Sequence, residues 1–179
     1  MLSIAIGAYA VPAKQGDHGP GVFWSSVHQT PDAPNTQMRI VPVQAYIEDT
    51  GTRKGNGVFA AKPFAVGETV EVCPVVSFLD GSSELPRELK RVIFNWGYLT
   101  GNPGPQGLAL GYGSMYNHSN PANMRYRADP ASVTLHFIAV RPIATGEELT
   151  VNYNAHGGGA EWDDNAWFQR MGVEPLAEE

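Results

Sequence analysis

The feature that most constrains the fold is a short pattern that occurs twice in the sequence. Residues 58–72 read VFAAKPFAVGETVEV and residues 137–151 read FIAVRPIATGEELTV, at a constant offset of 79 residues. Each copy contains a strand-like run, a basic residue before proline, a Gly-Glu turn and a second strand-like run. Proline suits the corner because it cannot donate to a β ladder, and glycine permits the turn. We predict two similar β corners in one compact, strand-rich domain, since a solenoid needs three or more units.

The composition is that of a globular chain with many turns. The 179 residues are 42% hydrophobic and 17% charged, and they include 20 glycines and 14 prolines. This favours one domain of short strands over long helices. The net charge of −6 comes without a run of Lys or Arg, which argues against direct nucleic-acid binding and permits a basic protein partner. The one cysteine, Cys73, excludes an intramolecular disulfide and a cysteine-rich zinc site, and it fits a reducing compartment.

The chain is predicted to have three parts: an irregular N-terminal arm over residues 1–37, an organised domain over 38–155 and a C-terminal helical extension over 156–179. Residues 2–10 are apolar and end in Ala-Tyr-Ala, which faintly resembles a signal-peptidase site, but the run is short and lacks a positive start. A loose or partly docked terminus is the favoured interpretation. No apolar stretch approaches the roughly 20 residues that span a bilayer. We expect an intracellular, cytoplasmic or nuclear protein without membrane contact.

One helix is predicted between the two copies, because apolar residues recur there on one face at helical spacing. These residues are Leu85, Leu89, Val92, Ile93 and Trp96. Ser82 or Ser83 is expected to cap this helix, and Pro86 suits its first turn. A second helix is predicted over residues 161–171, ended by Gly172.

Three segments could carry chemistry, and each has a plain structural alternative. In Lys54-Gly55-Asn56-Gly57, two glycines would let a ligand approach the backbone, although Asn-Gly also favours a hairpin turn. Residues 111–119 lead into Asn-His-Ser, whose amide and imidazole can both donate and accept hydrogen bonds, although the histidine could simply fix the loop. Residues 146–154 contain Tyr153, which alone would be an ordinary half-buried strand tyrosine.

Together the three segments resemble the SET-domain family of protein lysine methyltransferases. The shared pattern is Gly-x-Gly, then Asn-His-Ser about 60 residues later, then Gly-Glu-Glu-Leu-Thr-x-x-Tyr about 30 residues later still. The resemblance covers residues 39–154. It implies a mainly β fold with a few short helices, β-clip-like and with a threaded pseudoknot. A protein or peptide lysine is the implied substrate and S-adenosyl-L-methionine the implied cofactor, with no metal required.

The resemblance also implies roles for individual residues. Gly55 to Gly57, with Lys54 beside them, would contact the methionine part of the cofactor through backbone groups. Asn117 and His118 would contact its adenosine part, and Tyr153 would be the catalytic tyrosine. The attacking lysine must be neutral although its ordinary pKa is about 10.4, and an apolar channel beside a cationic sulfonium would lower that pKa. We therefore assign Tyr153 a positioning and electrostatic role, not that of a general base.

An aromatic channel is expected to hold the lysine, with core packing as the alternative for each candidate. The candidates are Tyr98, Tyr112, Tyr116, Tyr126 and Phe78. Tyr126 lies eight residues after His118, where some family members place a tyrosine that limits the number of methyl groups. Trp162 or Phe168 is a further candidate, for covering the cofactor.

The sequence also departs from the family pattern at several positions. Asn120 stands where cysteine is common, Pro121 is shifted, Ser114 replaces a frequent arginine, Asn152 replaces an acidic residue, and Val151 stands where many members have Phe or Tyr. The cysteine-rich tail that closes the channel in many histone-modifying members is not found in these 179 residues. Residues 155–171, the N-terminal arm or a second subunit would have to complete the site.

These departures keep a second hypothesis open, a SET-like binding module without catalysis. A third, a metal hydrolase using His118, His136 and His156, is disfavoured because the three histidines lack compact ligand spacing. The target protein and the oligomeric state are not predicted.

Overall fold

The computed structural model describes residues 40–79, 85–90, 92–155, 158–162, 165 and 168–169. These residues all belong to one compact unit, Gln37–Glu179. The predicted arm over residues 1–37, the capping serines Ser82 and Ser83, and Gly172 lie outside the described residues. The three domain boundaries therefore stay predictions. Within the described part of the chain, no helix is long and apolar enough to cross a membrane.

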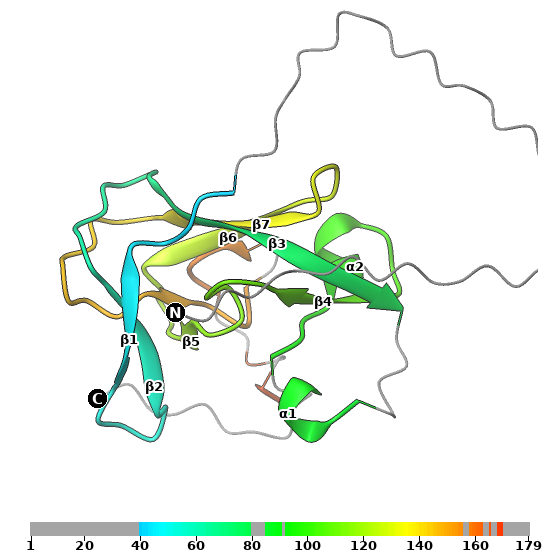
Figure 1. The fold of residues 1–179 in the computed structure, drawn as a ribbon, viewed down its shortest axis with the longest axis horizontal. Coiled ribbons are helices and arrows are strands. Elements are labelled where there is room, and N and C mark those ends of the chain that lie inside the picture. The colour runs from blue at the N-terminus through cyan, green and yellow to red at the C-terminus, as the bar shows by residue number, and fades with distance from the viewer. Residues whose placement is uncertain are drawn as a thin grey trace, which may run out of the picture. The chain divides into compact units, whose positions relative to one another are not determined.

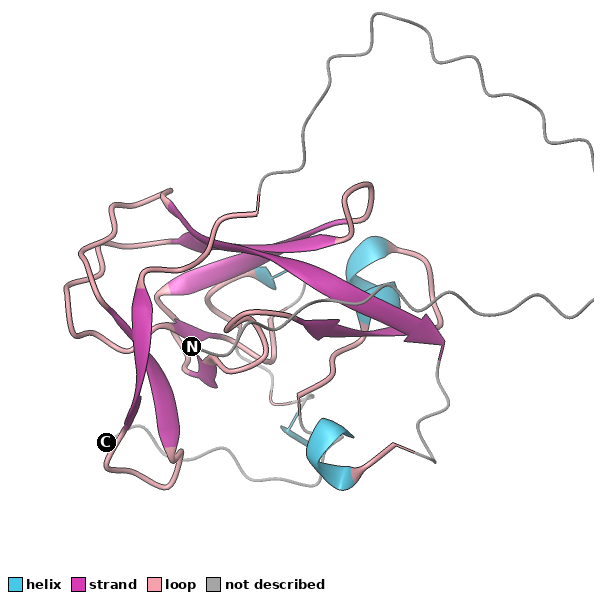
Figure 2. Cartoon of the chain, in the orientation of Figure 1, coloured by secondary structure: helices cyan, strands magenta, loops and turns pink. Residues whose placement is uncertain are grey.

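In the described residues, eight strands form three small sheets, which can be followed in Figures 1 and 2. Their bounds are β1 Ala45–Asp49, β2 Asn56–Ala60, β3 Thr69–Leu79, β4 Pro105–Ala109, β5 Asn117–His118, β6 Met124–Asp129, β7 Thr134–Ala139 and β8 Thr150–Val151. The largest sheet has the order β4-β3-β7-β6, and its pairings are all antiparallel. The β1–β2 hairpin stands beside it in Figure 1, and β5 pairs with β8 in parallel. The mainly β fold with a few short helices is therefore confirmed.

The prediction of one continuous helix between the two copies is wrong. Two short helices occur there, α1 Arg87–Lys90 and α2 Trp96–Thr100. Phe94 separates them because its backbone pairs with Gly107 in the middle of the edge strand β4, with N–O distances of 2.9 and 2.8 Å. Asn95 then restarts the helix by accepting a hydrogen bond from the amide of Tyr98 at 2.8 Å.

The second predicted helix, over residues 161–171, is only partly described. The amide of Gln169 donates to the carbonyl of Asn165 at 2.9 Å, which is the spacing of a helical hydrogen bond. Residues 163–164, 166–167 and 170–171 lie outside the described residues, so the length of this helix stays a prediction.

The predicted pair of β corners is confirmed, and the two corners pair with each other. Phe64 and Ile143, one from each copy, exchange both backbone hydrogen bonds at 2.9 and 3.0 Å. The bond from the Ala60 amide to the Glu147 carbonyl has its counterpart in the bond from Ala139 to Glu68, at 2.9 and 3.0 Å. Every partner maps onto its equivalent at the sequence offset of the repeat. The repeat therefore forms a local two-fold arrangement of two corners.

The side chains follow the same local two-fold relation. Glu68 accepts from the amide of Ala65 and pairs with Lys62, while Glu147 accepts from the amide of Ala144 and pairs with Arg141. These contacts lower the pKa of both carboxyl groups, with the Lys62 hydrogen bond as the main cause for Glu68. The basic residue, the proline and the Gly-Glu pair of each copy thus serve to close its own corner.

The core lies between the largest sheet and these corners. Its most deeply buried side chains come from several strands and from both corners. They include Val58, Met124, Phe137, Ile143 and Leu149. Burial of such apolar side chains supplies the main favourable term in folding. The core fixes the corners and, with them, the strand ends where the polar segments of the sequence meet.

Candidate functional site

The first two polar segments meet through the side chain of Asn117. Its amide Nδ2 donates to the backbone carbonyl of Asn56 at 3.1 Å and to Glu148 Oε1 at 2.7 Å. Asn117 occupies β5, whose parallel pairing with β8 places it opposite Thr150. The glycine segment, the Asn-His segment and the Gly-Glu-Glu segment are therefore joined at one point, although they are far apart in the sequence.

The two glycine positions of the first segment favour glycine for different structural reasons. Gly55 has a φ of 74°, the left-handed conformation that glycine adopts most readily, and it closes the β1–β2 turn. At Gly57 a Cβ atom would lie 2.5 Å from Glu148 Oε1, so only glycine allows the strand to approach this carboxylate. Gly55 therefore agrees with the hairpin alternative, whereas Gly57 lies against a carboxylate of the protein itself, and the approach of a ligand to this backbone stays a prediction. Lys54 is exposed in the same turn.

Tyr153 is held between the backbone and the side chain of the Asn-His segment. Its hydroxyl donates to the backbone carbonyl of Tyr116 at 2.6 Å, and its amide donates to His118 Nδ1 at 3.0 Å. Burial, with the nearby Glu148 carboxylate, raises the pKa of Tyr153 to about 12. The phenol therefore stays protonated near neutral pH and acts as a hydrogen-bond donor of fixed direction.

His118 has an aromatic neighbour on each of two segments. Its ring centroid lies 5.4 Å from that of Tyr153 and 4.7 Å from that of Phe168, the latter at an interplanar angle of 69°. Phe168 is buried, whereas Trp162 is 39% exposed. Phe168, one of the two candidates for covering the cofactor, therefore contacts a predicted cofactor-binding residue.

The predicted channel tyrosines do not form one group. Tyr126 donates through its hydroxyl to the carbonyl of Ala155 at 3.1 Å, two residues beyond Tyr153, and burial raises its pKa. Tyr98 lies on α2 with 52% of its surface exposed. Phe78, on the far part of β3, is partly exposed. Tyr126 is therefore the candidate that the fold brings to the segment around Tyr153.

The prediction that the Tyr116 side chain lines the channel needs correction. The ring is 1% exposed, packs edge-on against Phe137 at 4.7 Å, and donates its hydroxyl to Glu71 Oε2 at 2.6 Å. The core-packing alternative describes this side chain. Tyr116 contributes to the site through its backbone carbonyl, which accepts the hydrogen bond from Tyr153.

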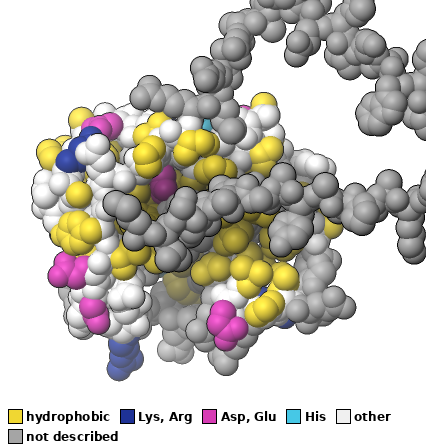
Figure 3. All heavy atoms as spheres, viewed as in Figure 1, with side chains coloured by type: hydrophobic (Ala, Val, Ile, Leu, Met, Phe, Trp, Pro, Cys, Tyr) yellow, Lys and Arg dark blue, Asp and Glu magenta, His cyan; other side chains and the backbone are white. Residues whose placement is uncertain are grey.

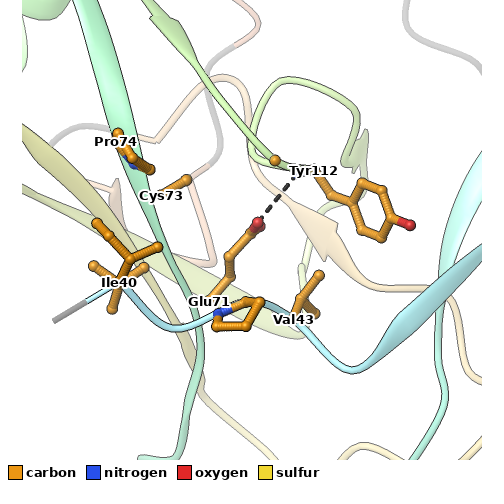
Figure 4. A pocket seen from close by; sticks show the side chains of 9 residues that line it. Ile40, Val43, Glu71, Cys73, Pro74 and Tyr112 are labelled. Carbon is orange, nitrogen blue, oxygen red and sulfur yellow. Dashed lines mark hydrogen bonds between the residues drawn. The ribbon is translucent and has the colours of Figure 1, made fainter. Parts of the chain in front are cut away.

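Glu71 is a buried carboxylate that the sequence did not single out. It is 3% exposed, and it accepts from the hydroxyl of Tyr116 and, at 3.1 Å, from the amide of Tyr112. Burial raises its pKa despite both hydrogen bonds. Figure 4 shows it in the wall of a hollow of about 290 Å³, with the Tyr112 ring directed away from the carboxylate. Tyr112 thus contacts Glu71 through its backbone amide.

Glu148 is a second residue that sequence reasoning missed as part of the site, and the repeat contained the signal. Its neighbour Glu147 matches Glu68 of the first copy and closes a corner in the same way. Glu148 matches Thr69, so the corner does not require a carboxylate there. Its contact with Asn117 accounts for the second acidic residue.

Two of the predicted metal-hydrolase histidines are described, and they lie on different strands. His118 on β5 accepts from Tyr153, and the ring of His136 on β7 lies 3.1 Å from Thr134 Oγ1. His156 lies outside the described residues. Among the residues that are described, no three His, Cys, Asp or Glu side chains are grouped so that they could hold a metal ion.

Comparison with known proteins agrees with this geometry. The model of the SET domain family matches residues 55–154, more than half of the chain. The histone-lysine N-methyltransferase, H3 lysine-37 specific, of Schizosaccharomyces pombe is 34% identical over 120 residues, which cover 66% of this chain and 80% of that protein.

Two solved structures share the fold at lower identity. A chain of an active polycomb repressive complex 2 matches with a TM-score of 0.52 and 20% identity over 66% of this chain and 17% of its own. A chain of a humanized Chaetomium thermophilum polycomb repressive complex 2 matches with a TM-score of 0.52 and 19% identity over 65% and 15%. The family model and the fungal relative establish that the chain belongs to the SET-domain family of protein lysine methyltransferases, and the solved structures share its fold.

Proposed function

We propose that this protein transfers a methyl group from S-adenosyl-L-methionine to the ε-amine of a lysine in a protein substrate. The observation that carries the proposal is the meeting of three separated segments. Asn117 contacts the backbone of Asn56, and Tyr153 contacts both His118 and the Tyr116 carbonyl. A cofactor made of adenosine and an amino acid, together with a substrate lysine, needs binding groups from several segments at one place.

The residues present fit this cofactor in shape and chemistry. The bare backbone at Gly57 approaches Glu148 more closely than any side chain would allow. The Glu148 carboxylate suits a ligand that carries an ammonium and a sulfonium charge, since opposite charges attract at short range. The rings of His118 and Phe168 pack edge to face and supply an aromatic surface next to Asn117 in the sequence. When bound, the cofactor supplies the methyl group and the positive sulfonium.

The protein's own contribution is then alignment and exclusion of water. The hydroxyl of Tyr153 has a fixed direction and stays neutral because its pKa is about 12. Tyr116 and Ala155 present carbonyl oxygens that accept from Tyr153 and Tyr126 in the same region. Oriented groups of this kind accelerate a displacement by holding the reacting atoms in line. A desolvated lysine loses its proton more easily, so no protein base is needed at Tyr153.

Two narrower aspects of the function are also proposed. The fungal relative is specific for histone H3 lysine 37, so histone H3 is the first substrate to test. The net charge of −6 is compatible with such a basic partner. We further propose that the protein works inside the cell.

The decisive experiment combines cofactor binding with methyl transfer. Calorimetry with S-adenosyl-L-methionine should give saturable binding, and labelled cofactor should transfer its methyl group to histone H3 or to another lysine-rich protein. Tyr153→Phe should lower kcat by about a hundredfold, the usual cost of removing one oriented donor, while cofactor binding is retained.

Tyr46→Phe provides the matched control, because Tyr46 is 40% exposed on β1 and also loses only a hydroxyl. It should keep the activity of the unaltered protein. If no cofactor binds at millimolar concentration, the proposed function fails. Cofactor binding without transfer to any basic protein would favour the alternative, a SET-like binding module.

A further inference from the structure

Two of the residues that depart from the family pattern contact each other. Asn120 and Asn152 lie 32 positions apart, and Asn152 Nδ2 donates to Asn120 Oδ1 at 3.0 Å. Asn152 is fully buried, and its Oδ1 accepts from the amide of Asn154 at 2.9 Å. A cysteine at position 120 or a carboxylate at position 152 could not reproduce this amide-to-amide bond, because neither carries the required pair of groups.

Both asparagines also form hydrogen bonds with residues that follow Tyr153 in the chain. Asn120 Nδ2 donates to the carbonyl of Trp162 at 2.8 Å, and Asn120 Oδ1 lies 3.4 Å from the amide of the same residue. Asn152 Nδ2 reaches the carbonyl of Ala160 at 3.5 Å, and that carbonyl accepts a shorter bond, 2.9 Å, from the amide of Ala122. We call Asn120, Asn152 and their bonds to Ala160 and Trp162 the asparagine clasp.

A second attachment lies next to the clasp. Gly158 has a φ of 78°, and a Cβ atom there would lie 1.8 Å from the carbonyl oxygen of Tyr126. Tyr126 in turn donates to Ala155. The backbone of residues 158–162 is therefore fitted closely to β6 on one side and to the clasp on the other.

The consequence of these attachments appears at Phe168. Its ring is buried against His118, a residue predicted to bind the adenosine part of the cofactor. Asn154, directly after Tyr153, also reaches this part of the chain, with Nδ2 lying 3.4 Å from Asn165 Oδ1. Phe168 follows Ala160 and Trp162 in the chain, and the clasp holds the carbonyls of these two residues.

We propose that Asn120 and Asn152 are positioning residues: the asparagine clasp fixes residues 160–162 so that Phe168 lies against His118 and completes the cofactor-binding pocket. This inference rests on the proposed function. It assigns the closing of the site to Ala160, Trp162 and Phe168, which belong to one of the three sources that the sequence left open.

The test uses Asn120→Asp in the full chain, because Asn120 is partly exposed and aspartate has nearly the same shape. The substitution removes both donor hydrogens and places a carboxylate against the carbonyl of Trp162. Hydrogen exchange of the unliganded protein should become faster in residues 158–162. Calorimetry should show a Kd for S-adenosyl-L-methionine raised about tenfold, the expected effect of losing one or two hydrogen bonds. The KM for the cofactor should rise while kcat at saturating cofactor changes little.

A double variant separates positioning from a merely structural effect. Phe168→Ala alone should also raise the cofactor Kd about tenfold, since it removes the ring that the clasp is proposed to place. If the clasp acts through this ring, Asn120→Asp combined with Phe168→Ala should raise Kd by little more than either single change. Independent effects would multiply to about a hundredfold and would overturn the proposal.

Asn102→Asp is the matched control, because Asn102 is exposed in the turn after α2 and the charge change is the same. It should leave exchange and affinity unchanged. Unaltered exchange in Asn120→Asp would overturn the clasp, whatever the cofactor does. Absence of cofactor binding by the unaltered protein would instead overturn the proposed function, and hydrogen exchange would still decide whether the clasp fixes residues 158–162.

Discussion

At the scale of single residues, burial raises the pKa of two side chains, the Tyr153 phenol and the Glu71 carboxyl group. Tyr153 is kept neutral by burial and donates to a backbone carbonyl, and Glu71 has a raised pKa because burial outweighs its two hydrogen bonds. Tyr116 links them, since its carbonyl faces Tyr153 and its hydroxyl faces Glu71. The protonation of Glu71 is therefore connected to the backbone that orients Tyr153.

Glu71 is predicted to make stability depend on pH. Its pKa is above the ordinary 4.5 in the folded protein, so the folded state binds the proton more tightly than the unfolded state does. Its contribution is fully present below pH 4.5 and is lost as the pH rises through the folded pKa. Glu71→Gln cannot titrate. The unfolding free energy of the unaltered protein should therefore fall, relative to that of this variant, as the pH rises from 4.5.

Urea denaturation at a series of pH values measures this difference. Glu88→Gln, at an exposed position on α1, serves as the control and should run parallel to the unaltered protein. A constant difference between Glu71→Gln and the unaltered protein from pH 4 to pH 8 would show that Glu71 has no raised pKa.

At the scale of elements, the two corners of the repeat pair with each other. Gly67 and Gly146 are equivalent in the repeat, and each has a φ of 79°. Both donate their amides across the local two-fold axis, to Ala139 and Ala60 respectively, at 2.8 Å. The corners place β2 and β8 in their positions, and these strands carry Gly57 and lead to Tyr153. A substitution in a corner should therefore lower the free energy of unfolding before it affects the site.

Gly67→Ala and Gly146→Ala are each predicted to destabilise the protein by about 1 kcal/mol, because a side chain raises the energy of a left-handed residue. Space is not limiting, since no atom lies within 3.4 Å of the added Cβ at either site. Thermal denaturation should show similar losses for the two variants. Gly67→Asn should cost less, because asparagine tolerates this conformation. Unequal losses would contradict the equivalence of the corners.

At the scale of the whole molecule, the charge bears on the substrate rather than on the chemistry. The chain has a net charge of −6, and acidic side chains are scattered over the face drawn in Figure 3. A scattered negative charge attracts a basic protein over distances limited by the Debye length, about 10 Å at 0.1 M salt. It contributes little to the alignment of one lysine inside the site.

Salt is therefore predicted to act on substrate capture. The kcat/KM for intact histone H3 should fall several-fold when salt is raised from about 50 to 300 mM, while kcat changes little. A short lysine peptide with no net charge is the control and should show a weaker salt dependence. Equal dependence for both substrates would assign recognition to local contacts at the site instead of the overall charge.

Much of the site was predictable because it depends on order along the chain. The repeat determined two corners, each closed by its own proline, Gly-Glu pair and basic residue, and such local contacts are written in neighbouring positions. The sequence alone also identified Asn117, His118 and Tyr153, and the fold brings these residues together. The family was recognisable for the same reason.

Only the tertiary structure decided the direction of individual side chains and whether the helix predicted between the two copies is continuous. Helical spacing predicted one helix through Phe94, but pairing with Gly107 broke it, because a distant strand offered its backbone hydrogen bonds. Tyr116 turned into the core because Glu71, buried on β3, required a donor. Two of the departures from the family pattern, Asn120 and Asn152, became partners across 32 positions. Sequence patterns record spacing along the chain, whereas these outcomes depend on which groups the fold brings within hydrogen-bond distance.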